Sequence, residues 1–135
     1  MIEIKASIGK DQYQTKLSNG RGHENVADEP AEFNGSDTGF APDEWLASAL
    51  ASCSIITMRM YADRKGWPLE RIEMQVQFER LEKTSKFVKH IRFIGELDEE
   101  QQHRLLVIGE KCPVHKTLSN PIEISSVIIK SEDSL

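Results

Sequence analysis

The chain has 135 residues and a formal net charge of -5, with 17 basic and 22 acidic side chains. Nucleic-acid-binding proteins present basic surfaces, so this balance argues against a nucleic-acid partner. A hydrophobic content of 39% and a charged content of 29% are ordinary for a globular protein and exclude disordered and fibrous chains. Two cysteines are too few for a disulfide-rich secreted scaffold. We therefore expect one domain over residues 1–135.

No part of the sequence has the pattern of a signal peptide or of a membrane span. The longest uncharged run, over residues 45–58, is shorter than the roughly 20 residues that a spanning helix requires. We expect a soluble, cytoplasmic protein that does not bind a membrane.

The N-terminal third predicts short strands. Alternating apolar residues predict a strand over residues 2–8, and a turn at 9–11 leads to a partner strand over 13–17. A second turn follows at 19–20, where Asn and Gly tolerate a positive φ. Residues 27–41 lack any period, and a loop of this length inside a compact domain is usually functional.

A long helix is predicted over residues 42–65. Pro42 suits the first helical position, and Asp43 and Glu44 complement the positive end of the helix dipole. Gly66 is a natural stop for the helix. Because apolar or small side chains surround most of this helix, we expect it to be buried on most sides.

The C-terminal half predicts a hairpin followed by helices. Two strands, over 72–79 and 87–94, flank a turn at 83–86. A helix over 99–111 starts with the capping-box pair Asp98 and Gln101, and Pro113 interrupts it. A short helical turn and a last strand over 122–129 complete the order, which defines an α+β fold with antiparallel sheets.

Cys53 lies in the middle of the long helix and admits two interpretations. A buried Cys often serves only as a small core hydrophobe. A reactive thiolate at this position requires a nearby cation, which Arg21 or Arg59 could supply. Asp43 and Glu44 could orient that arginine, or they could serve only the helix dipole.

Cys112 and His115 form a C-x-x-H pattern, which raises a metal-binding alternative. Together with Cys53 and His23 they could complete a tetrahedral zinc site. The pattern alone is weak, and its proline does not help the chain to wrap around an ion. A zinc-stabilised structural domain therefore stays open as an alternative, although we expect no metal.

Four segments of the chain form a recognisable set: NGRGHENVADEP at 19–30, GFAPDEWLASALASC at 39–53, RMYADRKGWPLE at 59–70 and KCPVHKTL at 111–118. The most specific signal among them is a helix that opens with Pro-Asp-Glu and ends its motif in a cysteine, paired with a later Cys-Pro-Val. Together these segments resemble the OsmC/Ohr family of osmotically inducible and organic hydroperoxide resistance proteins.

The resemblance implies an OsmC-like fold with a long central helix that carries a cysteine, assembled as an intertwined homodimer. It implies that Cys53 attacks an organic hydroperoxide and that Cys112 resolves the sulfenic acid as an intramolecular disulfide. Arg21 matches the arginine of the family's site, and the family's glutamate falls on Asp43, a departure that shortens the acid by one methylene, with Glu44 beside it. A dithiol, for example of the lipoyl type, would reduce the disulfide, without a metal or flavin cofactor. A non-catalytic relative that binds a small apolar ligand at the dimer interface is the alternative.

Overall fold

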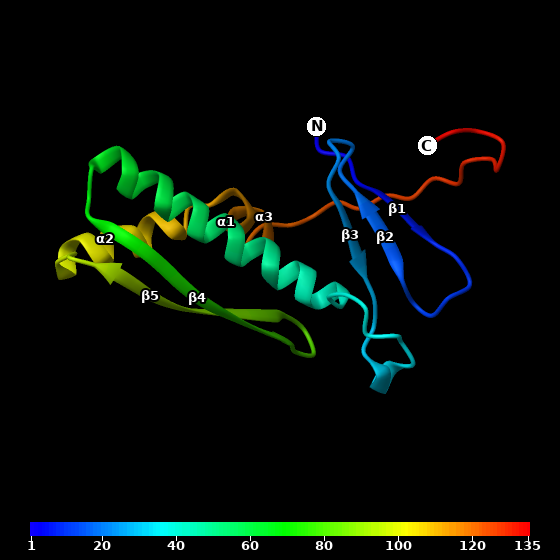
Figure 1. The fold of residues 1–135 in the computed structure, drawn as a ribbon, viewed down its shortest axis with the longest axis horizontal. Helices are drawn as coiled ribbons and strands as arrows, with labels where there is room; N and C mark the ends of the chain where they lie inside the picture. The colour runs from blue at the N-terminus through cyan, green and yellow to red at the C-terminus, as the bar shows by residue number, and fades with distance from the viewer. The chain divides into compact units, whose positions relative to one another are not determined.

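The computed structural model describes all 135 residues, which form two compact units. The N-terminal unit comprises Met1–Trp45 and Ile124–Leu135, and the C-terminal unit comprises Leu46–Glu123. The elements are β1 (Lys5–Ile8), β2 (Thr15–Ser18), β3 (Glu24–Ala27), the 3-10 turn η1 (Ala31–Phe33), α1 (Pro42–Lys65), β4 (Leu69–Arg80), β5 (Ser85–Gly95), α2 (Glu99–Gly109) and α3 (Pro113–Leu118) (Figure 1). The antiparallel sheets and the long helix confirm the predicted α+β class.

In the N-terminal unit, β1, β2 and β3 form an antiparallel sheet in that order. Leu17 of β2 lies opposite Ala6 on one side and Asn25 on the other. The first strand begins at Lys5 and not at residue 2, because Ser18, the last residue of β2, pairs with Lys5. Residues 2–4 therefore have no neighbouring strand.

One carboxylate organises the loop that follows β3. Asp28 is buried, and its oxygens accept hydrogen bonds from the backbone N–H groups of Tyr13, Glu29, Ser36 and Thr38 and from the Thr38 hydroxyl. The Thr38 hydroxyl bond, followed by the backbone bonds, holds the pKa of Asp28 well below its ordinary value of 3.8 despite burial. The aperiodic segment is thus an ordered loop.

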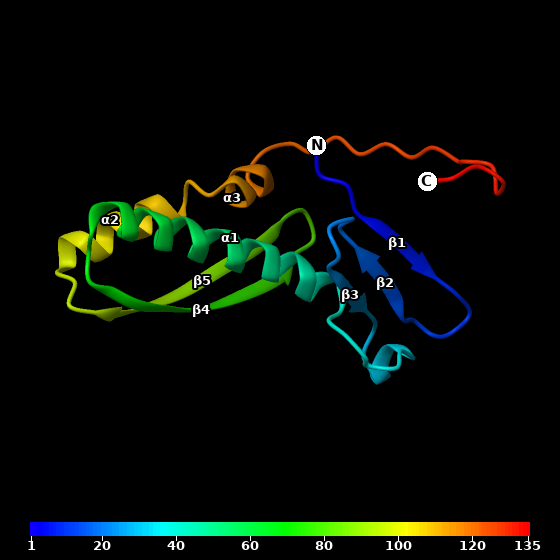
Figure 2. The ribbon, with the colours of Figure 1, turned by 45° about the horizontal axis from the view of Figure 1, so that its top comes forward.

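In the C-terminal unit, β4 and β5 form a long antiparallel hairpin with the three helices on one of its faces (Figure 2). The buried core between helices and hairpin consists of Met58, Ala62, Leu69 and Leu105. Gly109 allows α2 to approach α1 closely, because a Cβ at this position would lie 3.0 Å from Met58 Sδ. The helices and the hairpin therefore share one core.

The helix α1 spans the predicted residues, but the prediction that it is buried on most sides is wrong for the single chain. Only one stripe at four-residue spacing is buried, and it consists of Leu50, Ser54, Met58 and Ala62. Other apolar side chains stay exposed, including Ile56 at 51% and Met60 at 62%. One chain offers only the hairpin and two short helices to cover α1.

The predicted strand over residues 122–129 is also wrong for this structure. Residues 121–130 have no regular secondary structure, and Ile124, Val127 and Ile128 are 84% exposed or more. The alternating sequence supplies an apolar face, but a strand also needs a hydrogen-bonded neighbour. No strand of the chain pairs with this segment.

The predicted capping box of α2 is confirmed. Asp98 accepts a hydrogen bond from the Gln101 backbone at 2.7 Å, and Gln101 Oε1 accepts one from the Asp98 backbone at 3.0 Å. The helix ends at Gly109, and Pro113 then starts α3. None of the helices has both the length and the apolar character needed to span a bilayer.

Candidate functional site: a thiol pair with a lysine

Cys112 lies at the junction of α2 and α3 and is fully buried. Pro113 occupies the first turn of α3, which leaves Cys112 as the N-cap residue with extended backbone. Its Sγ accepts a hydrogen bond from the His115 backbone N–H at 3.3 Å. The N-cap position therefore fixes the orientation of the Cys112 side chain and supplies its sulfur with a backbone N–H donor.

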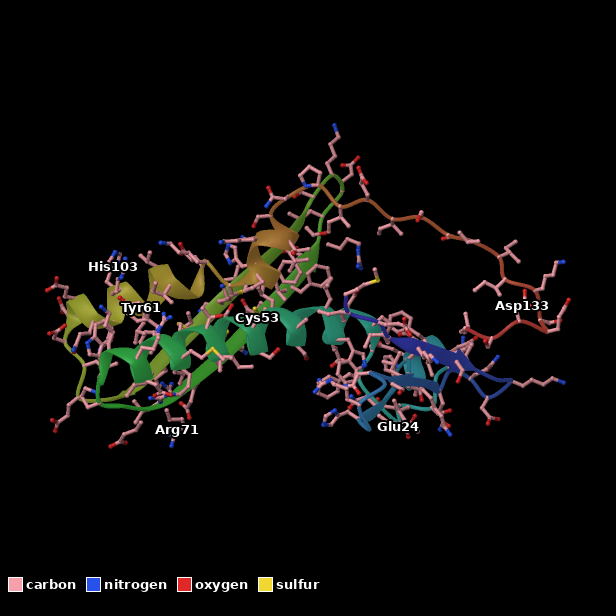
Figure 3. The ribbon with its side chains drawn as sticks, turned by 90° about the horizontal axis from the view of Figure 1, so that it is seen from above. Glu24, Cys53, Tyr61, Arg71, His103 and Asp133 are labelled. Carbon is pink, nitrogen blue, oxygen red and sulfur yellow. The ribbon has the colours of Figure 1, made fainter.

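Cys53 projects from the middle of α1, one position before the buried Ser54, and is partly exposed (Figure 3). Its thiol lies near enough to that of Cys112 for each to shift the pKa of the other, and both cysteines are free thiols. The two sulfurs that the sequence singled out are thus neighbours. Cys53 is the more accessible of the two.

A lysine completes the cluster. Lys89 lies on β5, and its Nζ contacts Ser54 Oγ at 3.1 Å and His115 Nδ1 at 3.1 Å. Ser54 Oγ in turn lies 3.6 Å from Cys112 Sγ. An ammonium group can only donate, so Ser54 Oγ and His115 Nδ1 are the acceptors. The single Ser54 hydroxyl proton is therefore available to the Cys112 sulfur.

These contacts separate the two thiols in acidity. Burial alone would raise the pKa of Cys112, but hydrogen bonds from Ser54, the His115 backbone and Cys53, together with the Lys89 charge, lower it below 9.0. Burial is the largest cause that raises the pKa of Cys53, and the Cys112 contact adds to it. Within this unit the lowered thiol pKa is that of Cys112, because Lys89 lies on its side. A cation that acts on Cys53 stays a prediction.

His115 is neutral in this arrangement. Burial, and after it the Lys89 charge, lowers the pKa of His115 below 6.5, while Glu110 acts in the opposite direction. With Nδ1 accepting from Lys89, the ring carries its proton on Nε2. The imidazole therefore supports Lys89 and adds no positive charge of its own.

A cavity of about 300 Å³ opens beside the cluster. Its polar wall includes Lys89 and His115, and its apolar wall consists of Leu50, Phe87 and Leu118. A small organic molecule with one polar end fits such a lining.

The other predicted site residues lie elsewhere. Arg59 donates to the Asp63 carboxylate and, at 2.7 Å, to the Leu69 carbonyl, so its guanidinium is committed to the end of α1. Arg21 is exposed and lies in a bend of the N-terminal unit, where its backbone N–H donates to Asn19 Oδ1 at 2.9 Å. Its proximity to Cys53 stays a prediction.

The two acidic residues at the start of α1 also belong to the N-terminal unit. Glu44 Oε1 accepts a hydrogen bond from the Ala41 backbone at 2.9 Å, which is the behaviour of a residue that caps a helix. Asp43 lies in the first turn of the same helix. A role for either in orienting Arg21 stays a prediction.

The zinc alternative gains no support from the geometry. No group of three or more His, Cys, Asp and Glu side chains is arranged to hold a metal ion. The His115 ring nitrogen that faces the cluster is occupied by Lys89.

The sequence analysis missed Lys89 and Ser54. The signal for Lys89 is its strand position, since it shares the inward face of β5 with Phe87, Ile91 and Phe93. A lysine at that phase of a strand is unusual and needs a partner. Ser54 carries the matching signal, because it lies in the buried stripe of α1.

The chain belongs to the OsmC-like protein family, whose sequence profile matches residues 35–127. No curated protein matches the sequence significantly. The matched residues include both cysteines, Lys89 and the whole of α1.

Solved structures share the fold at low identity. An OsmC-like protein from Mycoplasma pneumoniae is 20% identical, with a TM-score of 0.76 over 88% of this chain and 87% of that one. A protein from Psychrobacter arcticus, described as an osmotic stress induced and detoxification response protein, is 23% identical, with a TM-score of 0.76 over 87% and 88%. An organic hydroperoxide resistance protein from Legionella pneumophila is 20% identical, with a TM-score of 0.64 over 87% and 88%.

Proposed function

We propose that this protein is a thiol peroxidase that reduces organic hydroperoxides. The observation that carries the proposal is the proximity of a partly exposed thiol, Cys53, to a buried, more acidic thiol, Cys112. Two free thiols in contact can form a disulfide within one chain, which is the product of a two-cysteine peroxidase. The relative described as an organic hydroperoxide resistance protein supports the same class.

The first step takes place at Cys53. Its thiolate attacks the O–O bond of the hydroperoxide, the sulfur is oxidised to a sulfenic acid, and an alkoxide leaves and takes up a proton. When the pair has lost one proton, the charge lies mainly on Cys112, because its pKa is lowered and that of Cys53 is raised. Transfer of the remaining proton from Cys53 to Cys112 gives a thiolate on the accessible sulfur, and the departing alkoxide takes that proton, which returns Cys112 to its thiolate form.

Arg21 is the proposed cation for the departing alkoxide and for the Cys53 thiolate, with Asp43 or Glu44 as its carboxylate partner. A guanidinium binds an oxyanion through two parallel N–H donors, and a carboxylate behind it fixes its orientation. The family resemblance supports the role of Arg21, and it aligns the family's glutamate with Asp43, next to Glu44.

The proposed active form is a homodimer. Exposed apolar residues on α1, including Leu46, Ile56 and Met60, and the unpaired apolar residues after Glu123 support this assembly. A second chain could cover the former and supply a neighbouring strand for the latter. We also propose that a dithiol reduces the disulfide and that the protein acts in the cytoplasm. The proposed reaction uses no metal or flavin.

A second function is favoured by one observation. A cavity of about 420 Å³ beside α1 and β4 has a mostly apolar wall that includes Ile55, Ile56, Met60 and Ile72. A non-catalytic OsmC-like protein could bind a small apolar ligand there. The two functions differ in whether the cysteine thiols react with an organic hydroperoxide.

The deciding experiment is a free-thiol titration before and after one equivalent of an organic hydroperoxide, followed by peroxide consumption with dithiol and with monothiol reductants. We expect the loss of both thiols in the wild type and catalytic consumption with the dithiol. Cys53→Ser should consume no peroxide, since it lacks the attacking sulfur. Unchanged thiols in the wild type would support the binding function instead.

A further inference from the structure

We propose that Lys89, acting through the Ser54 hydroxyl, is a positioning residue that holds Cys112 as a thiolate ready to resolve the Cys53 sulfenic acid. The inference rests on the proposed peroxidase function and specifies how its second step is prepared. It assigns roles to two residues that the family motifs leave unassigned.

The direction of the hydrogen bonds carries the argument. Lys89 donates to Ser54 Oγ at 3.1 Å, so this oxygen acts as an acceptor and its own proton is free for another group. Cys112 Sγ lies 3.6 Å from the same oxygen. As a thiolate this sulfur can only accept, so it takes the proton of a hydroxyl that the ammonium polarises, and an anionic sulfur accepts more strongly than a thiol.

Burial makes this arrangement necessary. Cys112 has no exposed surface, so water cannot stabilise its charge, and a buried anion needs hydrogen bonds and a counter-charge. The structure provides three donors from two elements: the Ser54 hydroxyl and the Cys53 thiol on α1, and the His115 backbone N–H on α3. Lys89 on β5 supplies the positive charge.

The other groups near the cluster do not compete for this role. His115 is half-buried, and its Nδ1 accepts from the same ammonium, so it directs Lys89 and carries no charge itself. Glu110 raises the pKa of His115 and so opposes the effect of Lys89 there. Lys89 is the cation whose charge lowers the pKa of Cys112.

The step that this arrangement prepares balances without a further reactant. The Cys112 thiolate attacks the sulfur of the Cys53 sulfenic acid, an S–S bond forms, and the S–O bond breaks. The Cys112 sulfur is oxidised and the Cys53 sulfur is reduced. Hydroxide leaves and takes a proton from solvent to become water.

The experiment has two readouts. The first is an ultraviolet titration of the thiolate in a Cys53→Ser background, where Cys112 is the single thiol. We expect Lys89→Met to raise the pKa of Cys112 by about 1 unit, as expected for loss of one nearby cation. Lys89→Arg keeps the positive charge, so the pKa of Cys112 should stay close to its wild-type value. Lys86→Met, which removes an exposed lysine of the same strand, should change nothing.

Ser54→Ala tests the path from Lys89 to the sulfur. Because both residues act through one hydroxyl, the double variant Ser54→Ala/Lys89→Met should shift the pKa by less than the sum of the single variants. Additive shifts would mean that Lys89 acts directly through space, and an unchanged pKa in Lys89→Met would overturn the proposal. Ser54→Ala also provides an answer if Lys89→Met does not fold.

The second readout is the rate of disulfide formation after one equivalent of hydroperoxide, with Cys53 present. Below both pKa values, Lys89→Met has about tenfold less thiolate, partly offset by greater intrinsic nucleophilicity, so we expect a rate about threefold lower. A sulfenic-acid trap should then label Cys53 more strongly than in the wild type. If Lys89→Met shifts the pKa of Cys112 but leaves the rate of disulfide formation unchanged, Lys89 does not prepare Cys112 for the resolving step. A wild type in which peroxide forms no disulfide would instead overturn the proposed function, independently of the titration.

Discussion

Cys53 and Cys112 lie near each other, yet they differ in exposure, in backbone setting and in acidity. Cys53 is partly exposed in the middle of a helix, and burial raises its pKa. Cys112 is fully buried at a helix cap, and donors and a lysine lower its pKa. Access to substrate and stabilisation of charge are thus divided between two sulfurs. Such a division suits a reaction in which one thiol meets the peroxide and the other waits inside the protein.

Removal of the buried thiol should have the largest effect. We expect Cys112→Ser to react once with an organic hydroperoxide and then to stall or over-oxidise, because the sulfenic acid at Cys53 has no second thiol. Mass spectrometry after one equivalent should show one added oxygen at Cys53. Normal turnover of this variant with a dithiol would contradict the two-cysteine scheme.

The proximity of the two thiols also predicts where the disulfide forms. Since Cys53 and Cys112 are already neighbours within one chain, oxidation should link them within that chain. Non-reducing gel electrophoresis after peroxide treatment should show a band at monomer mass with both thiols lost. A dimer band that disappears with reductant would indicate that the resolving cysteine comes from the partner chain.

A smaller effect is expected from the arginines. Arg21→Ala should move the pH profile of Cys53 alkylation upward by about 1 unit, since a nearby cation favours the thiolate. Arg59→Ala is the matched control, because its side chain is bound to Asp63 and the Leu69 carbonyl. The assignment is wrong if Arg59→Ala shifts the profile and Arg21→Ala leaves it unchanged.

The smallest effect concerns the stability of the N-terminal unit, where the Asp28 carboxylate organises the loop that follows β3. The folded-state pKa of Asp28 is depressed, so the stabilisation is complete above the ordinary value of 3.8 and is lost as the pH falls below it. Thermal unfolding measured from neutral pH downward should therefore show a steeper loss in the wild type than in Asp28→Asn. Equal slopes would show that this carboxylate does not control the loop.

Elements with local signals could be predicted from the sequence. The long helix begins and ends where Pro42 and Gly66 indicate, and the α2 capping box is formed by the predicted pair. The segment 122–129 has an equally regular pattern, yet it forms no strand here. Its pattern describes one face of a strand, whereas the strand itself depends on a neighbour that no local signal specifies.

The candidate site shows the same limit. Both cysteines are recognisable from the motifs around them, and the structure brings them together. The contact of Lys89 with Ser54 joins residues 35 positions apart, and it depends on how a hairpin strand packs against α1. A lysine at an inward strand position and a serine in a buried helical stripe are each detectable, but only the fold pairs them.

The setting of Cys112 has a consequence for the return half of the proposed cycle. When a thiol attacks a disulfide, the sulfur with the lower pKa leaves faster. The donors around Cys112 make it the better leaving group, and its burial shields it from attack, so both properties direct an incoming dithiol to Cys53. The mixed disulfide with the reductant therefore forms on the accessible sulfur, and the buried thiolate is regenerated in the same step.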